Sequence, residues 1–324
     1  MKQRLSHQIV WQCILLAIAT VVLCPNAAFP QFKNPRIAVF TSDSLASTNR
    51  TLSGAQKIIS QNYPGAVFDK YLLKREPNSD TAVINSCKRD SVNIILTIGT
   101  SATQFAKDNF SKIPIVFSGV LYPALSGFIE SPTHPGGNIT GASLDIPLDV
   151  QFSYFKQIVP GLKRIGVLYT ESTAPLIPSA KIIAQQLGLT LVPRMVKEPR
   201  EVPAALDSLA EVTQGLWSVA DPVLFDAQST RYILKTTLRK MIPFMGFSRN
   251  VVESGALFAL DFDHKAIGFQ AGQIINDLIA GKDFSELNVT STDVIYFHFN
   301  EKTANHIKVA IPRDLVAIAK EVYK

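Results

Sequence analysis

The sequence predicts an α/β protein with two similar lobes, each built on a parallel sheet. Apolar strand-like runs alternate regularly with amphipathic helical segments, the pattern of parallel sheets covered by helices. The run RIGVLYT at 164–170 echoes RIAVFTS at 36–42, which indicates an internal duplication. Of the 324 residues, 47% are apolar and 18% charged, enough for large buried cores and too apolar for disorder.

The first half contains four expected strands with helical segments between them. A helical period runs through Leu52, Ala55 and Ile58 after the first strand, a second helical piece covers 81–87, and a third helix opens at Thr100. The strands are expected at 36–40, 67–73, 93–99 and 113–120.

The second half repeats this order of elements. Helices are expected at 148–159, 178–188, 201–212 and 264–281, followed by a helical tail over 314–323. Strands are expected at 164–170, 189–196, 215–221, 241–247, 255–263 and 293–300.

The glycine-rich run PGGNITG at 135–141 separates the halves. We expect the first lobe to comprise 34–141 and about 262–292, and the second 142–261 and about 293–324. The run is predicted to turn into the first crossing between the lobes, with Ile139 and Thr140 in the crossing strand. Gly136, Gly137, Thr140 and Gly141 are the predicted hinge residues.

The N-terminus has the layout of a secretory signal peptide. Lys2 and Arg4 precede an apolar stretch at 14–23, which is shorter than the roughly 20 residues of a membrane span. We expect residues 1–28 to be removed and the mature chain to be extracytoplasmic. Cys24 offers a lipid anchor as an alternative, which the bulky Leu23 before it disfavours.

The mature chain would retain one cysteine, Cys87, so no internal disulfide is expected. Removing the leader's two cations lowers the formal charge from +6 to 6 − 2 = +4. Without a Lys/Arg block, this mild charge argues against nucleic acid as a partner.

Signatures of catalysis and of metal binding are missing from the sequence. It contains no GxxxxGK[ST], GxGxxG or GxSxG motif, and its histidines form no HxxxH or HxH pair. We therefore expect no enzymatic activity, no cofactor and no metal. Two residues keep alternatives open: Cys87 is either a buried incidental thiol or a reactive one beside Lys88 and Arg89, and Asp263 either caps the next helix or joins Asp261 in a metal-like acidic run.

Polar residues at the ends of expected strands are the candidate ligand contacts, since solutes bind at the carboxyl edges of open α/β sheets. Thr100 and Ser101 open a helix and could cap it or hold a carboxylate. Asp221 could cap a helix or neutralise an ammonium group, and Tyr122 or Tyr169 could pack on an apolar part of the ligand. The full candidate set is Ser42, Asp43, Thr100, Ser101, Ser118, Gly119, Tyr122, Tyr169, Thr170, Asp221 and Asp261.

Several of these segments together resemble the substrate-binding proteins of ABC transporters, in particular those of the tryptophan-receptor type. The resemblance rests on IPIVFSGVLYPALSGFIESPTHPGGNITGAS, KRIGVLYTES, LGLTLVPRMV and GALFALDFDHKAIGFQAGQIINDLIAGK, in that order along the mature chain. It departs at V-L-Y-P, residues 120–123, where such proteins usually have a polar or acidic residue before the proline.

The resemblance implies a type I periplasmic binding protein, with two Rossmann-like lobes joined by three crossing strands. It implies capture of a small solute, such as an aromatic or other amino acid, between closing lobes and its delivery to a membrane permease. We expect a monomer. The alternative function is a sensory module that presents its solute to a membrane receptor or kinase.

Overall fold

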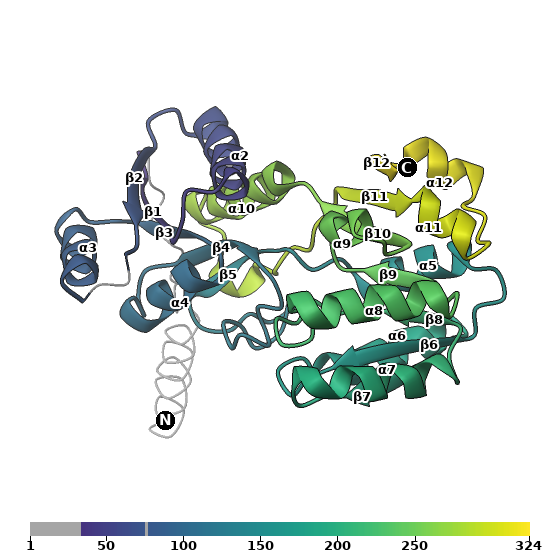
Figure 1. Cartoon of the computed structure of the whole chain (residues 1–324). Coiled ribbons are helices and arrows are strands. Elements are labelled where there is room, and N and C mark those ends of the chain that lie inside the picture. The colour runs from purple at the N-terminus through teal and green to yellow at the C-terminus, as the bar shows by residue number, and fades with distance from the viewer. Residues whose placement is uncertain (1–33, 75–76) are drawn as a thin grey trace, which may run out of the picture.

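The computed structural model describes residues 34–74 and 77–324, in which two separate sheets lie side by side (Figure 1). The first sheet has five strands in the order β2-β1-β3-β4-β5, all pairs parallel. We call this sheet with its helices lobe 1. Its strands are β1 (Arg36–Thr41), β2 (Val67–Leu72), β3 (Ile94–Ile98), β4 (Ile115–Val120) and β5 (Ile139–Ser143).

Side chains alternate between the two faces of the first sheet. Ile37 and Val39 of β1 face the core beneath α2 (Ala46–Asn62) and α10 (His264–Ile279). Ala38 and Phe40 face the opposite core, under α3 (Pro77–Arg89) and α4 (Thr100–Asn109). Strands buried on both faces explain the continuous apolar runs of the sequence.

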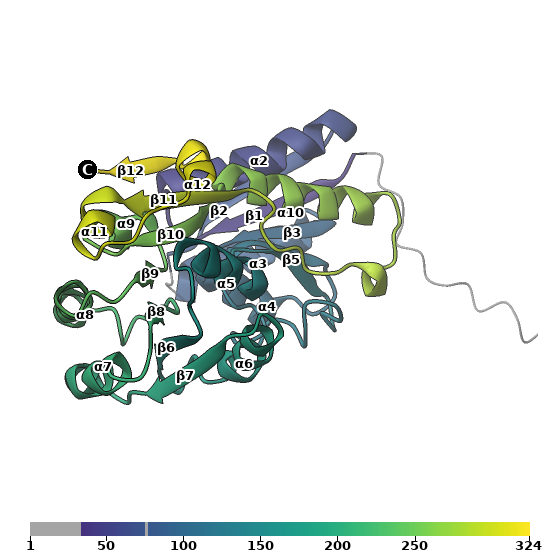
Figure 2. The same ribbon diagram turned by 90° about the vertical axis from the view of Figure 1, so that its right-hand side faces the viewer.

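Helix α10 lies against α2 although the two are far apart in sequence, as both views show (Figures 1 and 2). Glycines permit this contact: a Cβ on Gly268 would lie 2.0 Å from the carbonyl oxygen of Thr51, and one on Gly272 would lie 2.1 Å from Ile58. The glycines of the run 264–281 therefore attach this late helix to lobe 1.

The second sheet, with its helices, forms lobe 2 and has the order β12-β11-β10-β9-β8-β6-β7. The β10–β11 pair is antiparallel, and the other pairs are parallel. Its strands are β6 (Arg164–Tyr169), β7 (Thr190–Met195), β8 (Gly215–Trp217), β9 (Phe244–Gly246), β10 (Phe258–Phe262), β11 (Ile295–Asn300) and β12 (Glu321–Tyr323).

Helices cover both faces of this sheet too. One core contains Phe152, Phe155 and Trp217, and the other contains Leu206, Leu234 and Phe244. The first core is covered by α5 (Leu148–Ile158), α6 (Leu176–Gln186), α11 (Glu301–His306) and α12 (Arg313–Ile318). The second is covered by α7 (Val202–Ala210), which follows η1 (Pro199–Glu201), and by α8 (Ala227–Arg239) and α9 (Arg249–Glu253).

Three crossings join the lobes, after β5, after β10 and before β11. The first crossing is residues 144–147, the second is Asp263, and the third follows η2 (Phe284–Glu286). Backbone hydrogen bonds tie the third crossing to β5, from Ser143 N to Thr290 O at 2.8 Å and from Thr290 N to Gly141 O at 3.0 Å.

The crossing strand predicted at Ile139 and Thr140 therefore lies before the crossing that the structure shows. Ile139, Thr140 and Gly141 lie inside β5, in register with β4, and the chain leaves the sheet only after Ser143. The predicted lobe boundary after 141 shifts in the same way, because Ala142 and Ser143 still pair with β4.

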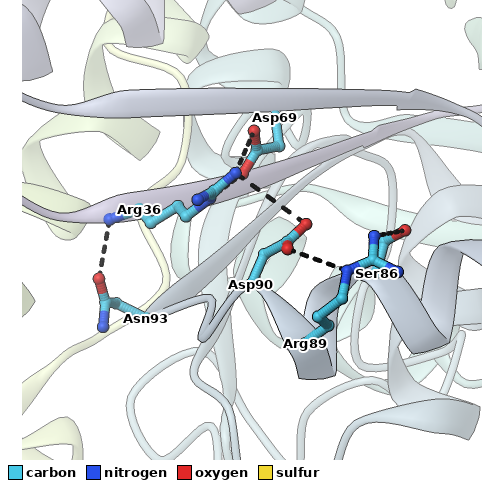
Figure 3. A network of polar contacts seen from close by, with 6 residues as sticks. All are labelled: Arg36, Asp69, Ser86, Arg89, Asp90 and Asn93. Atoms are coloured by element: carbon cyan, nitrogen blue, oxygen red, sulfur yellow. Dashed lines mark hydrogen bonds and ion pairs between the residues drawn. The ribbon is translucent and has the colours of Figure 1, made fainter.

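At the amino end of the first sheet, Arg36 joins three elements (Figure 3). Its guanidinium donates to Asp69 of β2 at 2.5 and 3.2 Å and lies 4.0 Å from Asp90, the residue after α3. The neighbouring Asp69 carboxylate raises the pKa of Arg36. The network lies at the edge opposite the crossings, so it stabilises lobe 1 without contacting any site between the lobes.

Most expected elements are confirmed, with three differences. The strand expected at 215–221 ends at Trp217, and the expected helical tail ends at Ile318 and continues as β12. Helices α8, α9 and α11 have no counterpart among the expected elements. The predicted leader and Cys24 lie outside the described residues, and no helix within 34–74 and 77–324 is long and apolar enough to cross a membrane.

Candidate functional site

A cavity of about 430 Å³ lies at the first crossing, with walls from both lobes. Lobe 1 contributes Leu121, Tyr122 and Pro132, and the crossing contributes 144–147. Most of the lining is apolar, as in typical small-molecule sites. The lobe 2 wall includes Leu148, Leu176, Met245, Phe247, Leu260 and Phe262.

Asp145 is the one ionisable acid among the residues that line this cavity, and no Lys, Arg or His lines it. Its Oδ1 accepts the backbone N–H of Tyr122 at 2.9 Å, and its own N–H donates to Ser143 Oγ at 2.9 Å. Burial raises the pKa of the Asp145 carboxyl, against the opposing effects of the Tyr122 N–H and the Ser143 hydroxyl. A carboxylate in an apolar cavity is suited to pair with a cationic group of a ligand.

Tyr122 lies between the lobes. It follows β4 of lobe 1, yet its ring packs against the apolar core of lobe 2. Its φ of 50° is in the left-handed region, a strained conformation for a bulky residue. Burial, together with the Asp145 charge, raises the pKa of Tyr122 well above its ordinary value, so the phenol stays neutral. The hydrogen bond from its N–H to Asp145 holds this backbone in place.

The remaining polar side chains of the cavity differ in whether protein hydrogen bonds leave them free to contact a ligand. Gln151 accepts from Trp217 Nε1 at 2.8 Å and donates to Ile146 O at 2.7 Å, so its amide is occupied. Ser218 Oγ donates to Met245 O at 2.7 Å. Ser248 precedes α9, and its hydroxyl does not cap that helix. A ligand would therefore meet apolar walls, Asp145 and a few hydroxyls.

The candidate residues of lobe 1 lie at the carboxyl edge of the first sheet. Thr100 is the first residue of α4, and the N-cap is Gly99, with φ of 88°, so Thr100 does not occupy the cap position. A buried contact between Thr97 and Thr103, 2.8 Å between their hydroxyl oxygens, anchors this helix start. The carboxylate role of Thr100 and Ser101 stays a prediction.

Two of the other lobe 1 candidates, Asp43 and Ser118, have structural partners. Asp43 Oδ1 accepts from Leu45 N at 3.0 Å and Thr48 Oγ1 at 2.6 Å, beside Ser42 at the start of α2. Ser118 is fully buried and donates to Ile267 O of α10 at 3.4 Å. Gly119, with φ of 73°, lies at an irregularity in the pairing of β4. None of these four residues lines the cavity at the first crossing.

In lobe 2, Asp221 is occupied by protein donors. Its Oδ2 accepts from Thr170 at 2.5 Å and Thr173 at 2.9 Å, and its Oδ1 accepts from Val223 N at 2.9 Å and Leu224 N at 3.3 Å. The aspartate is 2% exposed. Thr170 and Asp221 thus fix the loop after β8, whereas Tyr169 packs half-buried against the core. Asp145, which the sequence reading missed, is the more accessible acid.

Several alternatives left open by the sequence are now decided. Asp263 caps α10, accepting from Lys265 N at 2.7 Å and Ala266 N at 3.1 Å. Asp261 lies outside the cavity, among charged side chains. Cys87 is fully buried, and burial raises its pKa to about 11, which favours the buried incidental thiol over a reactive one.

The predicted hinge glycines serve the local backbone of lobe 1. Gly136 and Gly137 have φ of 73° and 58° in the turn before β5, away from the crossing. A Cβ on Gly141 would lie 2.1 Å from the carbonyl oxygen of Phe117, so this glycine permits close packing of β5 on β4. Thr140 is buried within the same strand.

Two α/β lobes, three crossings and a cavity between the lobes define a type I periplasmic binding protein. The sequence profile of the ABC transporter substrate binding protein family matches residues 67–323, and the chain belongs to this family.

Known proteins agree with this assignment. The chain is 27% identical over 217 residues to a tyrosine-binding protein of Clostridioides difficile, covering 66% of this chain and 62% of that protein. It is 23% identical over 208 residues to an uncharacterised protein of Rickettsia prowazekii, covering 64% of each. The chain thus spans a little under two thirds of the length of these relatives.

Solved structures show the same fold. A ligand-free, open substrate-binding protein with adhesive properties from Clostridium difficile superposes with a TM-score of 0.73 at 21% identity, covering 90% of this chain and 99% of that one. An ABC domain in complex with L-Trp from Streptococcus pneumoniae has a TM-score of 0.62 at 20% identity, covering 89% and 99%.

Proposed function

We propose that this chain captures an amino acid with a large apolar side chain between its lobes and delivers it to an ABC permease. The observation that supports this most is the cavity at the first crossing, whose walls are apolar apart from Asp145 and a few hydroxyl and amide groups. The Asp145 carboxylate would pair with the ligand's ammonium group, and Leu148, Phe247 and Phe262 would surround its side chain.

An aromatic side chain suits the cavity in size as well as in polarity. A volume of about 430 Å³ lies in the range of small-ligand sites. The tyrosine-binding relative and the L-Trp complex support the same class of ligand. The ligand carboxylate would be met by the start of α4, at Thr100 and Ser101, once lobe 1 closes.

The lobes would close on the ligand, because the groups proposed to bind it come from both of them. Tyr122 of lobe 1 and Phe247 and Ser248 of lobe 2 already line one cavity, whereas no residue of α4 does, so a ligand would contact α4 as well only after the lobes close. The protein acts as a binding component without catalysis, outside the cytoplasm after loss of residues 1–28, and as a monomer.

A thermal-shift series tests the ligand class. L-tryptophan, L-tyrosine and L-phenylalanine should raise the melting temperature, because a ligand that binds only the folded state stabilises it by mass action. Indole-3-propionate retains the ring and the carboxylate but lacks the ammonium group, so it should give a much smaller shift. The proposal fails if no apolar amino acid gives a shift, or if indole-3-propionate performs as well as L-tryptophan.

A further inference from the structure

A second cavity, of about 310 Å³, also lies between the lobes. It has a different chemical character, because most of its lining residues are ionisable. Lobe 1 supplies Arg50 from α2 and Lys265 from α10. Lobe 2 supplies Arg249 from α9 and Lys320, which directly precedes β12. In both views α2, α10, β11 and β12 lie along the same side of the molecule (Figures 1 and 2).

The acids of this cavity are occupied by protein donors. Asp263 accepts from Tyr296 Oη at 2.5 Å and caps α10. Glu321 accepts from Arg249 at 3.3 Å and from Tyr323 Oη at 2.6 Å, and Asp261 accepts the N–H of Phe262 at 2.8 Å. These bonds fix the positions of the three carboxylates, which keep their charge but are outnumbered by the four Lys and Arg side chains of the cavity.

Three cations of the cavity form no salt bridge with any described residue: Arg50, Lys265 and Lys320. The Lys320 ammonium lies 4.6 Å from the centre of the Tyr296 ring, and that of Lys265 lies 5.8 Å from the Phe269 ring. Four cations from the two lobes therefore share one cavity with three acids, and the excess positive charge attracts anions.

The buried side chain of His298 is a second, independent indication that this cavity binds a ligand. It lines the same cavity and is 2% exposed, yet neither ring nitrogen has a hydrogen-bond partner among the described residues. Its Nδ1 lies 3.4 Å from Glu321 Oε2, an ion-pair distance without hydrogen-bond geometry, whereas its Nε2 has no polar neighbour of either kind among the described residues. An unsatisfied buried imidazole is costly unless a ligand or water completes it.

We propose that this second cavity binds a small oxyanion, held by basic side chains of both lobes. The chemical class is that of inorganic phosphate, sulfate or a carboxylate, since Arg and Lys recognise all three through charge-assisted hydrogen bonds. Because Arg50 and Lys265 move with lobe 1, and Arg249 and Lys320 with lobe 2, the anion would bridge the lobes. It would offset the excess positive charge of the cavity.

Calorimetric titration of the solute-free protein with inorganic phosphate, sulfate and acetate tests the site. Ionic strength is held constant with chloride, because surface charge effects are screened by salt. We expect one saturable site for at least phosphate or sulfate, weakened about tenfold in Arg50→Gln and in Lys320→Gln. Lys181→Gln, an exposed cation of α6 outside both cavities, should bind like the wild type.

NMR spectra of the histidine rings test where the anion binds. Phosphate should shift the signals of His264 and His298, which line the cavity, and leave those of the exposed His134 and His306 in place. The proposal is overturned if neither phosphate nor sulfate saturates, if Lys181→Gln weakens binding as much as the cavity variants, or if the four histidines respond alike. None of these results depends on which amino acid the first cavity binds.

Discussion

The backbone N–H of Tyr122 donates to Asp145 Oδ1 at 2.9 Å, which ties the loop after β4 to the first crossing between the lobes. The same carboxylate faces the apolar cavity in which we place the ligand. Asp145 thus links three features of the molecule: the strained Tyr122 backbone, the crossing segment and the charge available to the ligand.

Asp145→Asn should weaken binding of an apolar amino acid about 10- to 100-fold, the effect of losing one charge-assisted hydrogen bond. The amide can still accept the N–H of Tyr122, so the loop should keep its position and the melting temperature of the free protein should change little. Isothermal titration calorimetry measures the loss. Asp149→Asn, an exposed acid of α5 outside the cavity, is the matched control and should bind normally.

Binding should also depend on pH through Asp145. Burial raises the pKa of its carboxyl above the ordinary value of 3.8, so protonation begins at a higher pH than for an exposed aspartate. The ionised form pairs with an ammonium group, and affinity should therefore fall as pH drops through the raised pKa. The free protein should respond in the opposite sense, because a folded-state pKa above the unfolded one adds stability as pH falls.

Calorimetry across a pH series checks this dependence. Affinity that decreases toward acid in the wild type and stays flat in Asp145→Asn supports the account. Parallel pH curves for the two proteins would assign the titration to another group.

Gly141→Ala should destabilise the protein by about 1–3 kcal/mol, toward the upper end because the clash is with the backbone of β4. Gly137→Ala should cost about 1–2 kcal/mol from its positive φ alone, since a Cβ there meets nothing within 4 Å. Urea denaturation measures both changes. If Gly141→Ala leaves stability unchanged and instead alters lobe closure in small-angle scattering, the hinge role expected from the sequence is the correct one.

Cys87 should resist alkylation in the folded protein. It is fully buried, and its pKa of about 11 leaves little thiolate at pH 8. Iodoacetamide followed by mass spectrometry should show modification only after unfolding in guanidinium. Rapid labelling of the native protein would mean that α3 opens readily or that the thiol is accessible.

The sequence predicted the lobes better than the site. Continuous apolar runs such as 36–40 and 93–99 become strands buried on both faces, where local pattern and tertiary packing agree. Helix α8 did leave signals that could have been used: Asp226 accepts from Ser229 N at 2.7 Å as its N-cap, and Ile233 and Leu234 form its buried face.

Long-range contacts decided the remaining elements and the site. The tail around Val322 has a helical apolar period, yet its pairing with β11 makes it a strand. Asp145 resembled a loop residue before Pro147, because its partner Tyr122 is 23 positions away. Asp221 is an acid near a strand end, as expected of a ligand contact, but hydroxyls from the loop after β6 donate to its carboxylate. The sequence alone does not show that protein hydroxyls occupy the carboxylate expected to bind the ligand.

A crystal structure of the protein with its best-stabilising amino acid would test the central claim most directly. We expect the ligand's side chain to lie against Leu148, Phe247 and Phe262, and its ammonium group to be within hydrogen-bond distance, about 3.2 Å or less, of an Asp145 carboxylate oxygen. A ligand bound elsewhere, or one whose ammonium group pairs with Asp221 while Asp145 stays unliganded, would contradict it.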